Sequence, residues 1–366
     1  MKLIIKKTIK INIKKTRYFS QNLLNWFDQH GRKDLPWQHD KTPYRVWVSE
    51  IMLQQTQVSN VIDYYQRFMT HFPTLESLAN ANEDAVLEQW AGLGYYARGR
   101  NLLKSAKIIQ AEHQGNFPNT HEAIVQLPGI GRSTAGAILS IAFKQQATIL
   151  DGNVKRVLCR HEAIEEWSGE RLTEKELWDV ADSYTPTNRV DDYTQAIMDL
   201  GATLCTRRAP SCARCPLSDS CLAFKQERQN ELPKSKPKKA IPQKHTWIIQ
   251  LESTHDKDPR ILLEKRPSPG IWGGLYSLPE KPAELSADQI IEQCEQEFSV
   301  KVIKNQTMPP FGHVFSHYKL ELKPIKLHVT APPLSVCENK QQLWVTETEI
   351  QSLGLPAPIK KYLNKS

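Results

Sequence analysis

Four cysteines stand close together in the 366-residue chain, at Cys205, Cys212, Cys215 and Cys221. Thiolates ligate soft metals, and an iron–sulfur cluster takes four of them. A zinc site usually comes as two C-x2-C pairs with a longer spacer between them. This segment has one close pair, in a C-x6-C-x2-C-x5-C pattern. We therefore interpret the cysteines as ligands of one [4Fe-4S] cluster; a zinc site, and disulfides or unliganded thiols, are the alternatives.

A glycine-containing turn, Leu127-Pro-Gly-Ile-Gly131, separates two helical patterns, the second of which begins at Ser133. Gly129 and Gly131 can adopt backbone angles that other residues avoid, and they let a ligand approach closely. The turn directs free amides and a helix N-terminus outward, which is a favourable place for a phosphate. We predict a helix–hairpin–helix that binds a DNA backbone; a plain packing corner between two helices is the alternative.

Two acids have surroundings suited to catalysis. Glu50 has apolar neighbours on most faces of its predicted helix, so burial would raise its pKa and keep it protonated as a general acid. An exposed glutamate on an amphipathic helix is the alternative. Asp151 lies twenty residues after Gly131, in the sequence Asp-Gly-Asn. It suits either a turn or helix N-cap, or the stabilisation of a cationic sugar beside DNA.

The rest of the sequence indicates which elements position these residues. Residues 20–228 show helical spacing of apolar residues and predict a helical domain. Residues 229–245 are rich in Lys and Pro and predict an extended linker. Residues 246–366 predict a separate α+β domain. Within it, strands are expected at 246–251, 260–264 and 311–330, and a helix at 287–298.

The net charge of +8 originates at the N-terminus, where residues 1–17 hold seven basic residues and no acid. The 41 basic residues that remain of 48 face 40 acids, a net charge of only +1. A DNA-binding surface must therefore be a local patch. Residues 1–19 are interpreted as a basic extension.

Composition also excludes two classes of protein. No apolar run approaches the roughly 20 residues of a membrane helix. Seven cysteines are an odd number, which disfavours a secreted disulfide framework and favours a reducing, intracellular compartment. Three isolated cysteines are expected to be structural: Cys159, Cys294 and Cys337.

Taken together, several stretches resemble the MutY-type adenine DNA glycosylases of the endonuclease III, or helix–hairpin–helix, superfamily. These stretches are Leu35-Pro36-Trp37, Trp47 to Gln57, Gly92 to Arg98, the hairpin, Asp151-Gly-Asn153 and the cysteine quartet. The resemblance implies a multidomain protein with an all-α helix–hairpin–helix glycosylase domain and a C-terminal α+β Nudix-like domain for lesion recognition. The cluster loop, residues 205–221, then belongs to the glycosylase domain.

The resemblance also implies the reaction, which is hydrolytic removal of adenine paired with 8-oxoguanine or G. In this interpretation Glu50 protonates adenine N7, Asp151 stabilises an oxocarbenium-like sugar, and Asn153 helps to position Asp151. Gln55 and Tyr95 act as wedges beside the extruded adenine and the opposite lesion, since the glycosidic bond is unreachable inside the duplex.

Ser133 occupies the position where bifunctional relatives carry a lysine that attacks the sugar and forms an imine. A serine hydroxyl cannot form an imine. We therefore expect a monofunctional glycosylase that leaves an abasic site.

The C-terminal half departs from an active Nudix box. Gly274 and Glu280 fit its start, but Asp288 stands where Arg is needed, and Gln289 and Gln293 replace two metal-binding glutamates. We expect no nucleotide hydrolysis, because hard cations need clustered carboxylates.

The stretch Phe315-Ser316-His317 instead resembles the family loop that reads 8-oxoguanine; an ordinary strand–turn sequence is the alternative.

The resemblance implies double-stranded DNA with A:8-oxoguanine or A:G mismatches as the partner, and no membrane. We expect a monomer in the bacterial cytoplasm, associated with the nucleoid. Three alternatives remain: a relative specific for thymine or oxidised pyrimidines, a non-enzymatic DNA-binding or redox-sensing protein, and a nucleotide pyrophosphohydrolase.

Overall fold

The computed structural model describes residues 13–236, 241–253, 259–267, 270–315, 318–330, 341–351 and 353–364. The chain forms two compact units. One holds residues 1–80 and 101–237, and the other holds residues 81–100 and 238–366. The chain leaves the first unit for the last time within the Lys- and Pro-rich stretch.

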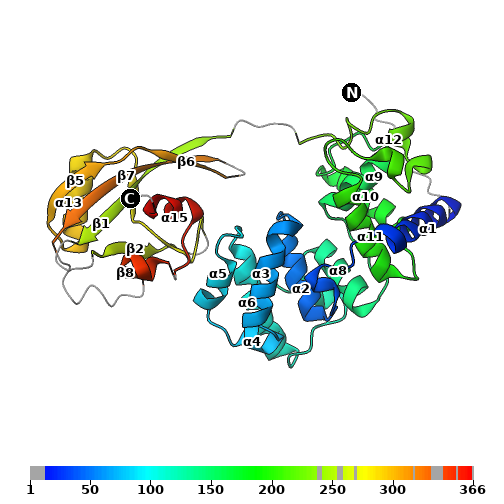
Figure 1. Ribbon diagram of the computed structural model, residues 1–366, viewed down its shortest axis with the longest axis horizontal. Helices are drawn as coiled ribbons and strands as arrows, with labels where there is room; N and C mark the ends of the chain where they lie inside the picture. The colour runs from blue at the N-terminus through cyan, green and yellow to red at the C-terminus, as the bar shows by residue number, and fades with distance from the viewer. Residues whose placement is uncertain are drawn as a thin grey trace. The chain divides into compact units, whose positions relative to one another are not determined.

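Helices make up the part of the chain before this stretch (Figure 1). The α-helices are α1 (Ile13–His30), α2 (Pro43–Leu53), α3 (Val58–His71), α4 (Leu75–Ala79), α5 (Glu83–Trp90), α6 (Ala97–Glu112), α7 (His121–Val125), α8 (Arg132–Phe143), α9 (Gly152–His161), α10 (Arg171–Tyr184), α11 (Val190–Thr203) and α12 (Leu222–Lys225). Short 3-10 turns are η1 (Pro36–Gln38), η2 (Cys212–Arg214) and η3 (Ser218–Ser220).

Apolar spacing and capping residues explain these helices. In α3 the buried residues Val61, Tyr65 and Phe68 recur at three and four, so one face meets the core. Thr42 caps α2 and Thr120 caps α7, each accepting a hydrogen bond from a backbone N–H of the first turn. The fold class expected from the sequence is confirmed for this half.

Helix α8 packs against α2 and α11 within the helical unit (Figure 1). Gly136, on its buried face, makes this packing possible, because an added Cβ would stand 2.1 Å from the carbonyl oxygen of Thr148. Only glycine lets the segment before Asp151 run this close to α8.

The second unit contains one mixed β-sheet. Its strands are β1 (Gln243–Ser253), β2 (Ile261–Lys265), β3 (Tyr276–Ser277), β4 (Glu280–Pro282), β5 (Val302–Thr307), β6 (Phe311–Val314), β7 (Lys319–Val329) and β8 (Gln342–Val345). The order is β3-β2-β1-β7-β5, while β4 pairs with β1, β6 with β7 and β8 with β2. Strands β1 and β7 run parallel, in the register Ile249 to Ile325, and the other pairs are antiparallel.

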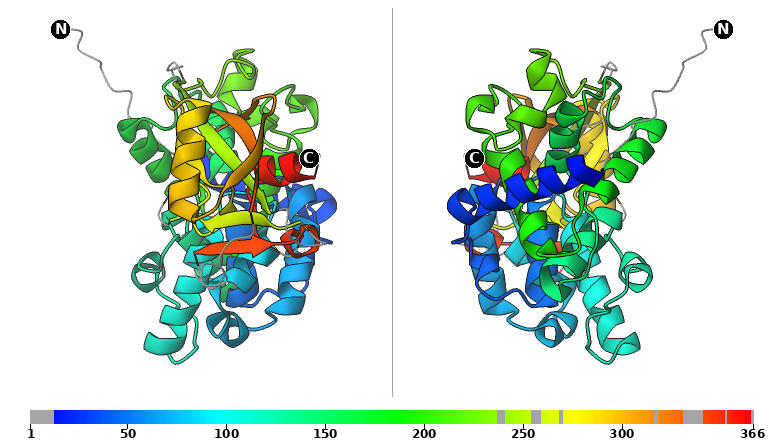
Figure 2. Two further views of the ribbon diagram at one scale, coloured as in Figure 1. Left: turned by 90° about the vertical axis from the view of Figure 1, so that its left-hand side faces the viewer. Right: turned by 90° about the vertical axis from the view of Figure 1, so that its right-hand side faces the viewer.

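Helices cover both faces of this sheet (Figures 1 and 2). Ile249 faces α13 (Ala287–Phe298), which contributes Ile290 and Phe298 to one core. Ile248, the neighbouring residue, faces the opposite core together with Ile359 of α15 (Ala357–Leu363). Helix α14 (Glu347–Ile350) belongs to that second face. The expected α+β domain is confirmed, and α13 spans the residues predicted to be helical.

Element ends differ from the expected boundaries at two places. Residues 13–19, expected in the basic extension, lie in α1, where Phe19 is fully buried. Residues 243–245, expected in the linker, already belong to β1, and Leu232 is buried in the first unit. In both places an apolar side chain or a strand partner orders a segment that its charge alone would leave extended.

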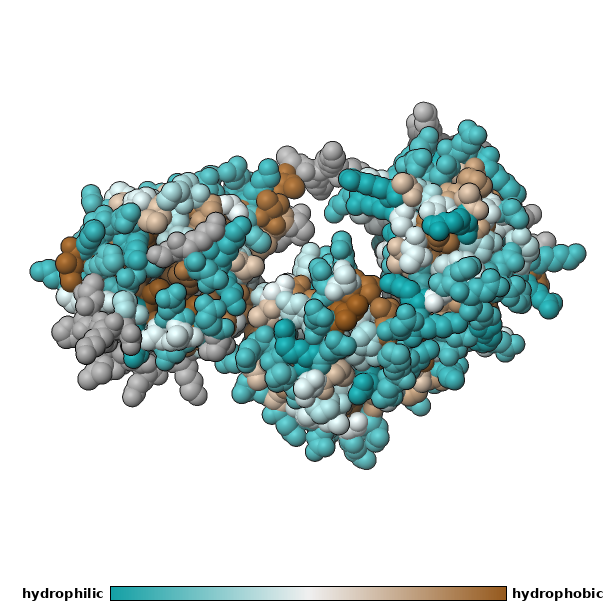
Figure 3. All heavy atoms as spheres, viewed as in Figure 1, coloured by the Kyte–Doolittle hydropathy of each residue, from teal (hydrophilic) through white to brown (hydrophobic). Residues whose placement is uncertain are grey.

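The face shown in Figure 3 is predominantly hydrophilic. The exposed large hydrophobic residues are spread along the chain: Ile13, Tyr18, Tyr95, Leu172, Phe224, Ile241, Ile303 and Val314. In the described parts of the chain, no helix has both the length and the apolar character needed to cross a membrane.

Candidate active site and cysteine cavity

Helix α2 carries Glu50 into apolar surroundings. Its neighbours Trp47, Ile51 and Met52 are almost completely buried. Burial, followed by the charge of Asp151, raises the pKa of Glu50 to about 8. The Glu50 carboxyl is therefore protonated at neutral pH, and it lies within electrostatic reach of a second carboxyl.

Asp151 is the N-cap of α9, with its Oδ1 accepting from the backbone N–H of Val154 at 2.7 Å. Asn153 donates its side-chain N–H to Oδ2 at 3.4 Å. Burial raises the pKa of Asp151, and these hydrogen bonds and the charge of Arg156 oppose the rise. The alternative of a helix cap is thus observed, and the charge of the same carboxyl also acts on Glu50.

Ser133 lies in the first turn of α8, where its hydroxyl accepts from the backbone N–H of Leu150 at 2.9 Å. The residue expected as the substitute for an imine-forming lysine therefore holds the segment that leads into Asp151. Lys155, four residues after Asp151, forms an ion pair with Glu174 at 2.6 Å.

In the hairpin between α7 and α8 the expected backbone angles are found at Gly129 but not at Gly131, whose φ of −93° and ψ of 173° are extended backbone that other residues also adopt. Gly129 has a φ of +81°, and a Cβ there would stand 2.9 Å from the Cβ of Asn101. Gly131 is the N-cap of α8 and offers no side chain to the free amides of the first turn. Among the described residues, nothing lies within 4 Å of a Cβ placed on Gly131. The helix N-terminus is therefore accessible to an anion.

Arg156 connects the acid-bearing turn to the cysteine segment. Its guanidinium donates to Asn153 Oδ1 at 2.8 Å, to the carbonyl oxygen of Gly201 at 2.6 Å and to that of Cys205 at 2.7 Å. Sequence reasoning missed this residue. The local sequence offers one indication of its role: Arg156 follows Asn153 by three residues, which places both side chains on one face of α9.

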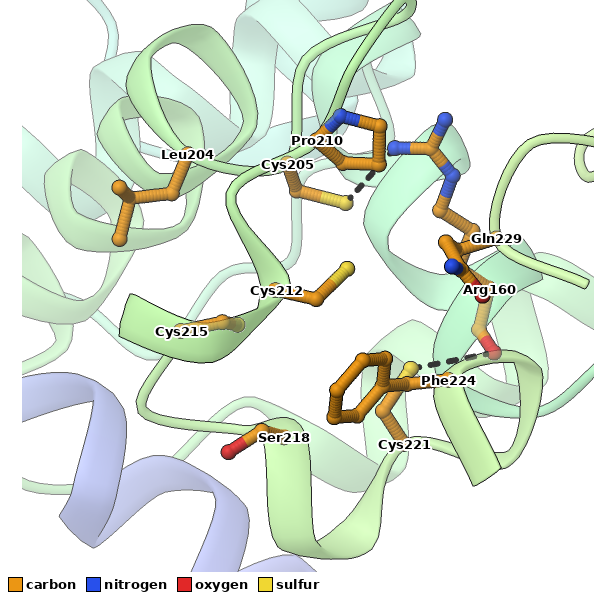
Figure 4. Close-up of a pocket in the computed structure, with 10 residues that line it drawn as sticks. All are labelled: Arg160, Leu204, Cys205, Pro210, Cys212, Cys215, Ser218, Cys221, Phe224 and Gln229. Carbon is orange, nitrogen blue, oxygen red and sulfur yellow. Dashed lines mark hydrogen bonds between the residues drawn. The ribbon is translucent and has the colours of Figure 1, made fainter. Parts of the chain in front are cut away.

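The four cysteines line one cavity, and Figure 4 shows the sulfurs of Cys205, Cys212 and Cys221 facing a common space. Burial raises the pKa of the Cys215 thiol to about 12. Among the described residues, no three His, Cys, Asp or Glu side chains converge as they would around a single metal ion.

Arg160, on the last turn of α9, adds a buried cation to this cavity (Figure 4). It is 2% exposed and donates to Cys205 Sγ at 3.3 Å and to the carbonyl oxygen of Thr206 at 2.7 Å. Thiols that deprotonate on ligation, together with a fixed positive charge, fit an anionic iron–sulfur cluster. Arg207, Arg208 and Arg214 are exposed on the same segment.

Gln55 and Tyr95 both lie at exposed turns with positive φ values, +56° and +52°. Tyr95 is 54% exposed. A bulky residue in this region of backbone space is an outlier, and such strain concentrates at functional sites.

In the second unit, Phe315 packs in an aromatic cluster with Trp272, His313 and Tyr318, at centroid distances of 5.3, 4.6 and 4.9 Å. Ser316 and His317 lie outside the described residues.

The residues that the structure places at Nudix-box positions form ion pairs and helix caps, or lie exposed at the surface. Glu280 pairs with Arg266, and Gln289 forms a capping box with Ser286 at the start of α13. Asp288 is exposed in the first turn of α13.

Comparison with known proteins agrees with this geometry. Residues 48–183 match the model of the HhH-GPD superfamily base excision DNA repair proteins, and residues 253–365 match that of the NUDIX domain. A solved thermostable thymine-DNA glycosylase aligns with a TM-score of 0.53 at 28% identity, over 58% of this chain and 98% of its own. The helical fold and the hairpin thus define a helix–hairpin–helix DNA glycosylase.

Relatives specify the family within this class. The adenine DNA glycosylase of Buchnera aphidicola (subsp. Acyrthosiphon pisum) is 40% identical over 95% of this chain and 97% of its own. The human adenine DNA glycosylase is 34% identical over 94% of this chain and 73% of its own. The chain belongs to the adenine DNA glycosylase family and is an enzyme that hydrolyses N-glycosyl bonds.

Proposed function

We propose that this enzyme excises adenine paired with 8-oxoguanine or guanine from double-stranded DNA, as a monofunctional glycosylase. The observation that supports the proposal is that the pKa of buried Glu50 is raised to about 8 by burial and by the charge of Asp151. A carboxyl that burial keeps protonated can serve as the acid, and a second carboxyl that accepts hydrogen bonds from Val154 and Asn153, which favour its ionised form, can serve as the electrostatic stabiliser.

The proposed reaction begins with extrusion of the adenine nucleotide, at a cost of a few kcal/mol. Protonated Glu50 gives its proton to adenine N7, which makes the base a better leaving group; such general acid catalysis contributes roughly 10²–10⁴-fold. Ionised Asp151 stabilises the positive charge that develops on the sugar, and Asn153 keeps that carboxylate in place. Water then adds to the sugar and leaves an abasic site.

Ser133 supports the monofunctional course, because its hydroxyl holds Leu150 and cannot form an imine. Gly129 and Gly131 provide the phosphate seat, and Gln55 and Tyr95 enter the helix as wedges. Phe315, Ser316 and His317 are proposed to recognise 8-oxoguanine. The protein is proposed to act as a monomer in the bacterial cytoplasm, at the nucleoid.

Cys205, Cys212, Cys215 and Cys221 are proposed to hold one [4Fe-4S] cluster. When bound, the cluster supplies four iron–thiolate bonds that crosslink the segment after α11. Exposed Arg207, Arg208 and Arg214 of this segment can then meet phosphates at fixed positions.

Duplexes that carry A opposite 8-oxoguanine, A opposite G or T opposite G test the proposal. After incubation with the protein, the first two should break only on treatment with hot alkali. Strand breakage without alkali, or cleavage of the T:G duplex alone, would contradict it. Borohydride should trap no protein–DNA adduct, because no amine stands at position 133.

A further inference from the structure

A buried polar network occupies the end of α9. His161 and Glu162 are 1% and 7% exposed. Glu162 Oε1 accepts from Tyr184 Oη at 2.5 Å and bonds to His161 Nδ1 at 2.6 Å, while Oε2 accepts from Lys15 Nζ at 2.6 Å. Three donors from three elements therefore converge on one carboxylate.

The protonation states follow from these partners. Burial alone would raise the pKa of Glu162, but the hydrogen bond and charge of His161, with the bonds from Lys15 and Tyr184, hold it at about 2. Burial lowers the pKa of His161 despite the charge of Glu162. Near neutrality the imidazole is thus neutral, and Nδ1 donates its N–H to the carboxylate. The other nitrogen, Nε2, is left as an acceptor.

The acceptor Nε2 lies 2.8 Å from the hydroxyl of Ser220, the last residue of η3. Ser220 directly precedes Cys221. The chain of contacts therefore runs from Lys15 on α1, through Glu162 and His161, to the residue beside a cysteine of the cavity.

Helix α1 contacts the network a second time. Phe19 stacks on Tyr184 with centroids 4.3 Å apart, and meets the His161 ring edge-on at 4.9 Å. Phe19 is fully buried, so it keeps water from the imidazole side of the network. In a dry environment the loss of one member leaves its partner unsatisfied, and the remaining bonds weaken with it.

We propose that Lys15, Glu162, His161 and Ser220 form one cooperative brace between α1 and the cysteine segment, so that α1 determines how firmly the protein retains its iron–sulfur cluster. The inference rests on the cluster assigned under the proposed function. Ser220 and His161 are positioning residues, because they act through the backbone of Cys221. A segment that composition assigns to a basic tail is here part of the cofactor's support.

Iron release from the purified full-length protein tests the brace. The protein is exposed to excess ferrous chelator, and loss of the visible iron–sulfur absorbance is followed. Lys15→Met and Ser220→Ala should each release iron about five- to tenfold faster than wild type, the effect of one broken hydrogen bond in a buried network. Arg17→Ala removes the same charge from an exposed position of the same helix and should match wild type.

The double variant Lys15→Met/Ser220→Ala distinguishes a brace from two separate contacts. If the four residues act as one unit, the double variant releases iron no faster than the faster of the two single variants. The single variant Ser220→Thr keeps the hydroxyl and should release iron at the wild-type rate. The inference would be overturned if the rate increases of the two single variants multiplied in the double variant, or if the single variants released iron at the wild-type rate. A wild-type protein without iron–sulfur absorbance would instead refute the cluster itself, so the two failures are distinguishable.

Discussion

Replacing Glu50 by glutamine should stabilise the protein in a pH-dependent way. A shift of the Glu50 pKa from 4.5 to about 8 means that folding opposes ionisation of this group. At pH 7 the unfolded chain ionises it and the folded chain does not, which costs the folded state about 3 kcal/mol at 1.36 kcal/mol per pH unit. Glutamine has nearly the same shape and carries no such cost.

The sign of the effect fixes the pH window. Below pH 4.5 both states of the wild type are protonated, so the contribution of Glu50 to stability is fully present and the variant gains nothing. This contribution of Glu50 to the stability of the wild type is lost progressively as pH rises from 4.5 through about 8. We therefore expect the variant's advantage to grow from pH 5 to pH 8, to roughly 6–12 °C in unfolding midpoint at pH 7.

Thermal unfolding of wild type, Glu50→Gln and Glu76→Gln measures this directly, since Glu76 is an exposed glutamate of α4. Adenine release by wild type should fall as pH rises through about 8, and the variant should lose roughly 10²–10⁴-fold in single-turnover rate. A stability difference that is the same at pH 5 and pH 8 would refute the assignment of a buried, protonated Glu50.

Three further substitutions have defined outcomes. Asp151→Asn keeps a helix N-cap but removes the charge, so adenine release should fall roughly 10²–10³-fold while gel-shift affinity for lesion duplex is kept; equal loss of affinity would show that Asp151 is structural. Gly201→Ala puts a Cβ 2.6 Å from the Cβ of Asn153 and should slow the single-turnover release of adenine. Ala202→Ser, at the neighbouring exposed position, should leave the rate unchanged. A normal rate in Gly201→Ala would disprove the positioning role of Asn153. Cys215→Ser should reduce iron content and DNA affinity before it affects chemistry on bound DNA, and an unaltered iron content would contradict the assignment of the ligands.

Local patterns made the hairpin and the fold class predictable. Gly129 has a positive φ and Gly131 brings no side chain to the N-terminus of α8, and a short sequence window is enough to reveal both glycines. The helix of α13 was likewise predictable, because its buried residues Ile290, Cys294 and Phe298 recur at helical spacing. The Asp-Gly-Asn sequence at Asp151 was compatible with a helix cap or with a catalytic acid. In the structure the same carboxyl caps α9 and acts electrostatically on Glu50.

The contacts that the sequence did not predict join residues far apart in the chain. Lys15 and Glu162 are separated by 147 residues, and no local signal connects a lysine of a basic tail with a glutamate at a helix end. Arg156 reads as an ordinary helical arginine until the carbonyl oxygens of Gly201 and Cys205 are placed beside it. The parallel pairing of β1 with β7 is non-local for the same reason.

The contact between α8 and the segment before Asp151 has a consequence for substrate selection. Gly136 meets Thr148, and Ser133 holds Leu150, so the N-terminus of α8 and the Asp151 carboxyl cannot move independently. If a phosphate binds at that N-terminus, the distance along the strand from this phosphate to the reacting sugar is set by the protein. The enzyme would then measure a position on the DNA strand before it reads a base, and a nucleotide extruded one step out of register would miss the carboxylate.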